Sequence, residues 1–249
     1  MQVQPLLSKP GRSLTTQITT DPALRLAAQR LRYAVFSKEY GADLDSATPG
    51  VDADRFDEHC DHVLVIDQET GEVVATTRIL HGRTAARIGG FYSEEEFDLS
   101  RLKANAGTFA ELGRTCVHPD YRSGTALSQM WLAVSQYLVR EQIDYLIGCA
   151  SISMLDGGGR AWRVAQQLQA EHLAPERFRV TPRRALPHLA NSTASVPVKI
   201  PPLIRTYMRL GAQVCGAPCW DPSFRCADML VLLKVEQIAG RFARKYLRQ

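Results

Sequence analysis

The chain has 249 residues and a formal net charge of +4, with 45% hydrophobic and 22% charged residues, an ordinary composition for a globular protein. Residues 1–159 carry 15 basic and 21 acidic side chains, whereas residues 160–249 carry 15 basic and 5 acidic ones. The C-terminal third is therefore expected to meet something negative, such as nucleic acid, an anionic membrane surface or an acidic protein. No run approaches the roughly 20 apolar residues of a membrane span, and the N-terminus lacks a secretory-signal pattern, so we expect a cytoplasmic protein.

The first hundred residues are predicted to hold, in chain order, a mobile tail over 1–13, a strand over 14–18, a helix from 22 to about 40, and hairpin strands over 62–67 and 72–80. Asp21 followed by Pro22 is a capping side chain before a proline, which favours a helix start. Residues 43–58 are acidic and interrupted by glycine and proline, which indicates a loop or lid. Ser93 with Glu96 forms a capping-box pattern before a short helix.

The remaining elements are predicted as strands over 108–117, 145–151 and 227–233 and helices over 125–140, 162–173, 203–210 and 235–248. Residues 175–202 contain prolines at 182, 187 and 197, which predicts a long irregular loop. Such an order of strands and helices indicates an α+β fold with a mixed sheet. We expect one domain over residues 14–249.

Six cysteines are present, without a CxxC pair and without a histidine at zinc-finger spacing. Three of them, Cys215, Cys219 and Cys226, are close in sequence, but a fourth metal ligand is missing. Reduced thiols and no bound metal are therefore expected.

The segment with the clearest chemical signal is residues 111–127, which is a strand running into a turn and an amphipathic helix. Such a turn directs backbone N–H groups at an anion. The order V-x-P-x-Y-R over residues 117–122 resembles the acyl-donor motif of the GNAT acyltransferase superfamily. Thr125 and Leu127 stand where that superfamily has glycines, and Gly124 is the one glycine kept. The shortened cradle favours the single phosphate of acyl carrier protein over coenzyme A.

A wider resemblance covers roughly residues 24–233 and identifies the L-ornithine Nα-acyltransferases of bacterial ornithine-lipid synthesis. The segments that carry it are residues 32–36, 54–57, 62–65, 71–80, 89–97, 111–114, 148–151, 201–212, and 221–224 with Asp228. The resemblance implies a GNAT-like fold, with a central mixed, mostly antiparallel sheet flanked by helices. It also implies transfer of a 3-hydroxy fatty acyl group from acyl carrier protein to the α-amine of L-ornithine, which gives lyso-ornithine lipid without a resident cofactor.

A second family shares part of this pattern. Acyl-homoserine-lactone synthases also have an arginine and a phenylalanine on the first helix, paired loop aspartates, a strand arginine and a glutamate three residues before an arginine. The residues that fit that set are Arg32, Phe36, Asp54, Asp57, Arg78, Glu111 and Arg114. The tryptophan expected after Phe36 is missing, so a lactone-type or other N-acyl amino acid synthase ranks second. A non-catalytic module that binds a carrier protein or a membrane ranks third.

Glu111 is the candidate general base, because an ammonium must lose a proton before it attacks a thioester. The alternative is a structural salt bridge from Glu111 to Arg114 or Arg78. The other candidates concern the amino acid: Asp54 and Asp57 could bind its cationic groups, and Arg78 and Arg114 could hold its carboxylate. These residues, with Arg32, could equally form a structural ion-pair network, and the two interpretations are compatible.

The acyl donor is expected to contact residues that follow Glu111 and one on a later strand: Cys116, Val117, His118, Tyr121, Arg122, Ser123, Gly124 and Ser151. Cys116 invites a covalent acyl-enzyme hypothesis, but no histidine stands in a clear pairing position, so direct transfer is favoured. Residues 235–248 form a basic amphipathic pattern, typical either of a helix at the anionic inner membrane or of a terminal helix packed on the sheet. The basic C-terminal third then suits an acidic carrier protein and an anionic bilayer, and nucleic acid lacks any binding motif.

Overall fold

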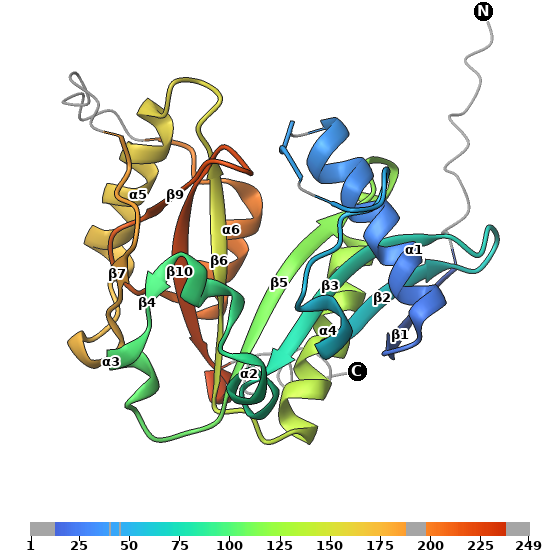
Figure 1. Ribbon diagram of the computed structural model, residues 1–249, viewed down its shortest axis with the longest axis horizontal. Helices are drawn as coiled ribbons and strands as arrows, with labels where there is room; N and C mark the ends of the chain where they lie inside the picture. Colours follow the sequence, from blue (N-terminus) through green and yellow to red (C-terminus); the bar gives the residue numbers. More distant parts are fainter. Residues whose placement is uncertain (1–12, 40, 45, 188–197, 238–249) are drawn as a thin grey trace, which may run out of the picture.

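A mixed eight-stranded sheet forms the centre of the protein, with helices on both of its faces (Figure 1). The structure is a computed structural model, which describes residues 13–39, 41–44, 46–187 and 198–237. The strand order is β1-β2-β3-β5-β6-β10-β8, with β9 paired to β10. Neighbouring strands in this sheet are antiparallel except β5 and β6, which are parallel. The predicted α+β class with a mostly antiparallel sheet is confirmed.

The strands are β1 (Leu14–Thr19), β2 (Asp61–Asp67), β3 (Val73–His81), β4 (Phe97–Asp98), β5 (Phe109–Val117), β6 (Tyr145–Ser153), β7 (Thr181–Pro182), β8 (Gln213–Val214), β9 (Cys219–Asp221) and β10 (Cys226–Lys234). The α-helices are α1 (Pro22–Tyr33), α2 (Gly82–Ile88), α3 (Ser100–Lys103), α4 (Thr125–Arg140), α5 (Gly159–His172) and α6 (Pro202–Leu210). A π-helical segment, η1 (Ala34–Glu39), and short 3-10 turns, among them η3 (Tyr92–Glu95), complete the described elements.

Two layers of helices cover opposite faces of the sheet, because alternate residues of each strand point to opposite faces. On one face, Leu146 and Leu233 pack with α4, and Ala150 and Met229 pack with α5 and α6. The other face carries α1 and the segment from α2 to α3 (Figure 1). Glu111 lies on this second face, since it pairs with Leu80 and Ile147 of that layer's core.

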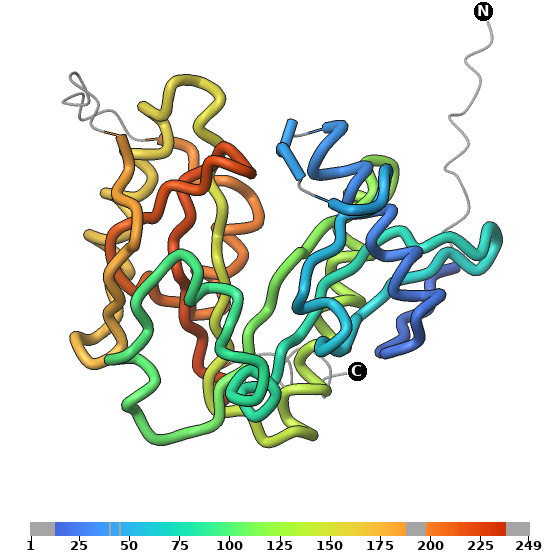
Figure 2. The backbone as a smooth tube through the Cα atoms, in the orientation of Figure 1, coloured from blue at the N-terminus to red at the C-terminus, as the bar shows by residue number. Residues whose placement is uncertain are grey.

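Strands β5 and β6 separate soon after they meet. Their pairing covers residues 109–111 against 145–147, and beyond these residues the two strands diverge (Figure 2). Gly148 lies just past this point, and a Cβ there would approach the Leu112 carbonyl oxygen to 2.4 Å. Only glycine allows this close backbone contact, which fixes the point where the sheet opens.

A β-bulge interrupts the pairing of β3 with β5. The register shifts between Thr76 and Arg78, and Arg114 on the bulged strand has a φ of 53°. A bulge adds one residue to one strand and changes which side chains face a given side. Cys116 therefore shares the Glu111 face, where it packs against α1 residues such as Leu31.

Most predicted elements are confirmed, including the hairpin, the helix over 125–140 and the predicted start of α1. Asp21 Oδ1 accepts hydrogen bonds from Ala23 and Leu24 at 2.9 and 3.0 Å, as a capping residue does. The helix predicted to reach Tyr40 is α-helical only to Tyr33 and continues as a π-helical segment.

The capping box predicted from Ser93 and Glu96 is wrong. The Phe91 N–H donates instead to the Glu94 side chain at 3.0 Å, and Ser93 lies inside the 3-10 turn. The Glu96 side chain is buried against Cys149 and does not cap the turn. Helices α2 and α3 were not predicted, since both are short.

The predictions for residues 1–12 and 238–248, and part of the loop predicted over 175–202, lie outside the described residues. In the remaining part of that loop, residues 176–178 form a 3-10 turn and residues 181–182 pair with β4. Residues 235–237 are helical, as expected for the start of the last helix. One domain over 14–249 stays a prediction.

Candidate active site

A cavity of about 750 Å³ lies where β5 and β6 diverge, and its size is typical of a site for a small molecule or cofactor. Its walls come from β3, β5, β6 and β10 and from α6. Glu111, Arg78, Arg114 and Tyr92 are among its polar lining residues, and apolar residues of the strands and α6 supply most of the surface.

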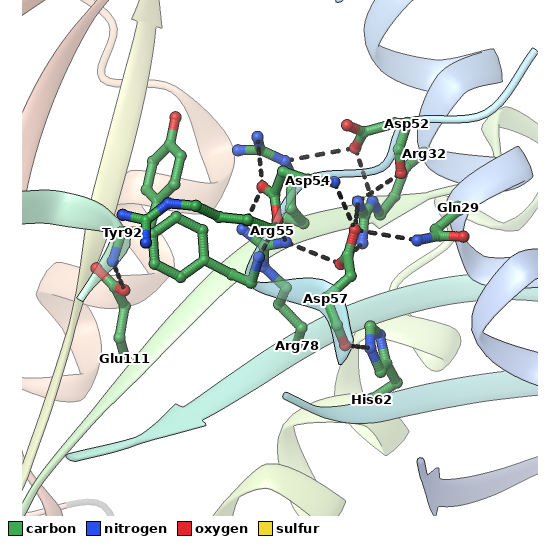
Figure 3. Close-up of polar contacts among 12 residues, drawn as sticks. Gln29, Arg32, Asp52, Asp54, Arg55, Asp57, His62, Arg78, Tyr92 and Glu111 are labelled. Atoms are coloured by element: carbon green, nitrogen blue, oxygen red, sulfur yellow. Dashed lines mark hydrogen bonds and ion pairs between the residues drawn. The ribbon is translucent and has the colours of Figure 1, made fainter. Parts of the chain in front are cut away.

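Glu111 is held by backbone N–H groups rather than by an arginine. One carboxylate oxygen accepts a hydrogen bond from the Tyr92 N–H at 2.7 Å (Figure 3), and the other accepts one from the Ser93 N–H at 2.9 Å. Burial raises the pKa of Glu111 and outweighs these hydrogen bonds and the nearby Arg78 charge. Among the described residues Glu111 forms no ion pair within 4.0 Å, so the alternative of a salt bridge to Arg114 or Arg78 is wrong.

Three arginines and three aspartates form a buried ion-pair network beside Glu111 (Figure 3). Arg32 binds Asp52 at 2.7 Å and Asp57 at 2.6 Å. Arg78 lies between Asp54 and Asp57, with the Asp57 contact at 2.8 Å. The sequence missed Asp52, because nothing distinguishes it from other acidic residues of its loop.

The network keeps Asp54 and Asp57 charged. Burial alone would raise the pKa of Asp57, but the hydrogen bonds and charges of Arg32 and Arg78 hold it well below its usual value. The same balance, with Arg78 and Arg114 as partners, lowers the pKa of Asp54. Both Asp57 oxygens already accept hydrogen bonds from arginines. The predicted structural ion-pair network is therefore present among Arg32, Arg78, Arg114, Asp54 and Asp57. Contact of these side chains with the substrate stays a prediction.

Of the three network arginines, Arg114 is the most open to a ligand. Its side chain is 12% exposed, compared with 1% for Arg32 and 4% for Arg78. It lines both the large cavity and a neighbouring cavity of about 380 Å³. Its guanidinium carbon lies 4.8 Å from the ring centroids of Tyr92 and Phe224, and such cation–π contacts fix its position.

Of the predicted donor residues, Cys116, Val117, Arg122, Gly124 and Ser151 line the large cavity. The other three, His118, Tyr121 and Ser123, are not among its lining residues. His118 Nδ1 accepts the N–H of Asp120, and the Tyr121 hydroxyl donates to Asp67 at 2.6 Å. Their contact with the donor is untested.

Cys116 has the properties of a structural thiol. It is buried, and burial raises its pKa to about 12, so the reactive thiolate is disfavoured at neutral pH. No histidine is hydrogen-bonded to it in the described part of the chain. This environment favours direct transfer over an acyl-enzyme.

A second acidic group, which the sequence did not predict, lies farther along the same face. Glu96, Asp221 and Asp228 are each at most 5% exposed, and Asp221 and Asp228 line the large cavity. Asp221 and Asp228 come from neighbouring strands of one hairpin and Glu96 from a segment more than a hundred residues earlier, and the three carboxylates are called here the acidic cluster. The resemblance included all three residues, Glu96 within its segment 89–97, but assigned the three carboxylates no role.

The mixed sheet with a cavity at its divergent strands is the arrangement that the resemblance to GNAT acyltransferases implied, and the comparisons with known proteins agree with that class. A family profile described as "Acetyltransferase (GNAT) domain" matches residues 31–132. The chain is 34% identical over 253 residues to the L-ornithine N(alpha)-acyltransferase of Brucella abortus (strain 2308), a match covering 94% of this chain and 89% of that protein. The chain therefore belongs to the L-ornithine N(alpha)-acyltransferase family, and it is an enzyme.

Solved structures agree on the fold. FeeM, an N-acyl amino acid synthase from uncultured soil microbes, superposes with a TM-score of 0.57 at 14% identity, covering 96% of this chain and 100% of that one. The AHL synthase LasI superposes with a TM-score of 0.54, also at 14% identity, covering 90% and 91% of the two chains. No helix in the described ranges is long and apolar enough to cross a membrane.

Proposed function

We propose that this enzyme transfers a 3-hydroxy fatty acyl group from acyl carrier protein to the α-amine of L-ornithine. The observation that carries the proposal is the buried Glu111 carboxylate at the point where β5 and β6 diverge, beside a large cavity, in a chain of this family. The product would be lyso-ornithine lipid.

Glu111 acts as the general base. It takes one proton from the α-ammonium of ornithine, directly or through water, and the amine then attacks the thioester carbonyl carbon. The C–N bond forms, the C–S bond breaks with its electron pair on sulfur, and the second amine proton passes to that sulfur, so that the carrier leaves as the thiol. A carboxylate with a raised pKa suits this step, because a base is most effective when its pKa lies near the working pH. The Tyr92 and Ser93 N–H groups hold the carboxylate in place.

Arg114 binds the α-carboxylate of the amino acid. It lines both cavities and is the most exposed of the three network arginines. A guanidinium can bind a carboxylate through two parallel hydrogen bonds. Arg32, Arg78 and the aspartates stabilise the arginine's surroundings, and Asp54 holds Arg114 at 3.1 Å.

The donor's phosphopantetheine arm enters between β5 and β6. The unpaired facing edges of the two strands offer backbone groups to its amides, as strand edges do. The first turn of α4, preceded by Gly124 with a φ of 105°, receives the single phosphate together with Arg122. Arg122 is held by Glu39 at 2.6 Å, so phosphate binding competes with that pair.

Assays with purified enzyme test the proposal. L-Ornithine, L-lysine and L-glutamine are each incubated with 3-hydroxyacyl carrier protein or with the corresponding coenzyme A thioester, and products are identified by mass. We expect Nα-acyl ornithine from the carrier-protein donor. The Glu111→Gln variant should lose about 10² to 10⁴ in kcat, and Cys116→Ser is the matched control on the same strand.

The outcomes are distinct. No acyl amino acid from any combination would reject the function, and acylation of lysine or glutamine in preference to ornithine would support the second-ranked activity, that of another N-acyl amino acid synthase. Full activity of Glu111→Gln at neutral pH would reject the base assignment alone. Faster turnover with coenzyme A would reject the donor assignment.

Contact with the inner face of the cytoplasmic membrane is also part of the proposal, because the product is a single-chain lipid and the C-terminal third is basic. Sedimentation with anionic and with neutral vesicles tests it, and equal binding to both would argue against an electrostatic contact.

A further inference from the structure

We propose that the acidic cluster of Glu96, Asp221 and Asp228 binds the side-chain ammonium of the amino-acid substrate and thereby selects ornithine over amino acids with a neutral side chain. The inference rests on the function proposed above. It assigns substrate specificity to residues apart from Glu111 and from the ion-pair network.

The cluster combines a local hairpin with one residue from a distant segment. Strands β9 and β10 pair so that Asp221 stands opposite Cys226, and Asp228 follows two residues later on the same face. One oxygen each of Asp221 and Asp228 and the Cys226 sulfur lie within 4.8 Å of one another. Glu96 comes from the segment between η3 and β4, which covers this face of the sheet. Its Oε2 accepts a hydrogen bond from the Cys149 thiol of β6 at 3.4 Å.

Two buried oxygens of the cluster lack a well-placed hydrogen-bond donor. Glu96 Oε1 and Asp228 Oδ1 accept no hydrogen bond of good geometry, although both residues are only 3% exposed. The side chains of Tyr92 and Ser151 interact with Glu96 and Asp228 respectively, and the two carboxyl groups interact with each other. A buried carboxylate oxygen without a donor is costly, so a ligand with donors is expected there. An ammonium group has three N–H donors and one positive charge.

The cluster also lacks a protein cation. None of its three carboxylates forms an ion pair with lysine or arginine within 4.0 Å among the described residues. Burial, followed by the charges of Asp228 and Asp221, raises the pKa of Glu96, so a proton occupies the cluster when no cation does. The ion-pair network, by contrast, matches its three aspartates with three arginines.

The thiol favours an ammonium over a metal ion. Metal binding through Cys226 needs its thiolate. Burial and the neighbouring carboxylates of Asp228 and Asp221 raise the pKa of Cys226, and its thiol donates to Asp228 Oδ2 at 3.5 Å. A neutral thiol that donates a hydrogen bond is a poor metal ligand.

The position of the cluster matches the shape of ornithine. Glu111 is opposite Ile147, and Cys149, the contact of Glu96, lies two residues farther along the same face of β6. The segment 92–96 both holds Glu111 through the Tyr92 N–H and presents Glu96. Ornithine has three methylene groups between its α-carbon and its side-chain ammonium. With the α-amine at Glu111, the side chain would therefore extend along β6 and direct the ammonium toward the acidic cluster.

The test compares L-ornithine with L-norvaline, which is ornithine without its side-chain amine. Norvaline is measured as a substrate or, where turnover is too slow, as a competitive inhibitor. The wild type should prefer ornithine by about a hundredfold or more in kcat/KM. Norvaline has no side-chain ammonium, so it would leave the buried carboxylates of the acidic cluster without a hydrogen-bond donor. Glu96→Gln and Asp228→Asn should each reduce this preference at least about tenfold, mainly through KM for ornithine.

Glu95→Gln is the matched control, because Glu95 is one residue away but 49% exposed and paired with Arg55. Thermal unfolding shows whether each variant is folded. An unchanged ornithine preference in folded Glu96→Gln and Asp228→Asn would overturn the proposal, as would equal wild-type use of ornithine and norvaline. Loss of the preference after EDTA treatment, restored by a divalent metal, would also overturn it. Acyl transfer to no amino acid at all would instead reject the proposed function.

Discussion

Replacing Arg32 with methionine should lower the free energy of unfolding by about 3 to 4 kcal/mol at pH 7. The Arg32 side chain is 1% exposed and donates four hydrogen bonds, two to Asp52 and two to Asp57, at 2.6 to 2.9 Å. Methionine fills much of the same volume but leaves two carboxylates buried with fewer partners. Breaking a buried ion pair costs about 3 to 5 kcal/mol of folding free energy. The loss expected here is below the upper end of that range, because Arg78 still binds Asp57 and Arg114 stays 3.4 Å from Asp52.

Urea denaturation followed by circular dichroism measures this loss. Arg101→Met is the control, because Arg101 is 58% exposed and makes one ion pair, to Glu176 at 3.2 Å. An exposed pair contributes about 0 to 1 kcal/mol, so the control should lose no more than that. A loss below about 1 kcal/mol for Arg32→Met would refute the structural importance of the network.

The pH dependence gives a second check on the same variant. The folded-state pKa of Asp57 is lowered, so its contribution to stability is present above the unfolded-state pKa and is lost as pH falls toward the folded value. The difference between wild type and Arg32→Met should therefore narrow below the ordinary aspartate pKa of about 3.9. A difference that widens with acid would contradict this sign.

Three further predictions concern catalysis and the sheet. The kcat/KM should rise with pH, with a midpoint above the usual pKa of glutamate, because Glu111 must lose its proton to act as a base. This rise should be absent in Glu111→Gln. A wild-type pH–rate profile whose midpoint lies at the usual pKa of glutamate would count against the assignment. Cys116→Ser should keep turnover within a few fold in steady-state assays, and complete loss in a folded variant would revive the acyl-enzyme hypothesis. Gly148→Ala should lower the free energy of unfolding by about 1 to 3 kcal/mol, measured by thermal unfolding, because the new Cβ would lie 2.4 Å from the Leu112 carbonyl oxygen. Gly113→Ala is the control, since its Cβ would lie 3.8 Å from the nearest atom and should be tolerated. Equal losses of stability in the two variants would argue against the close approach at Gly148.

Local patterns predicted most of the regular elements. The alternation of the hairpin, the stripe of the helix over 125–140 and the Asp21 cap depend on neighbours within a few residues, and all three appear in the structure. Short elements such as α2 and α3 escaped prediction, because a single helical turn or two carries little periodicity.

The sequence by itself determined the family and singled out Glu111, because motifs are read along the chain. Only the tertiary structure decided what surrounds that carboxylate. The fold of segment 92–96 over β5 gave Glu111 two N–H donors instead of an arginine, and Asp52 joined the network. The β9–β10 register put Asp221 and Asp228 together, and the segment after η3 brought Glu96 to Cys149 on the same face, from more than a hundred residues earlier in the chain. Periodicity reports on neighbours a few residues apart, whereas the environment of a buried charge depends on pairing between distant strands.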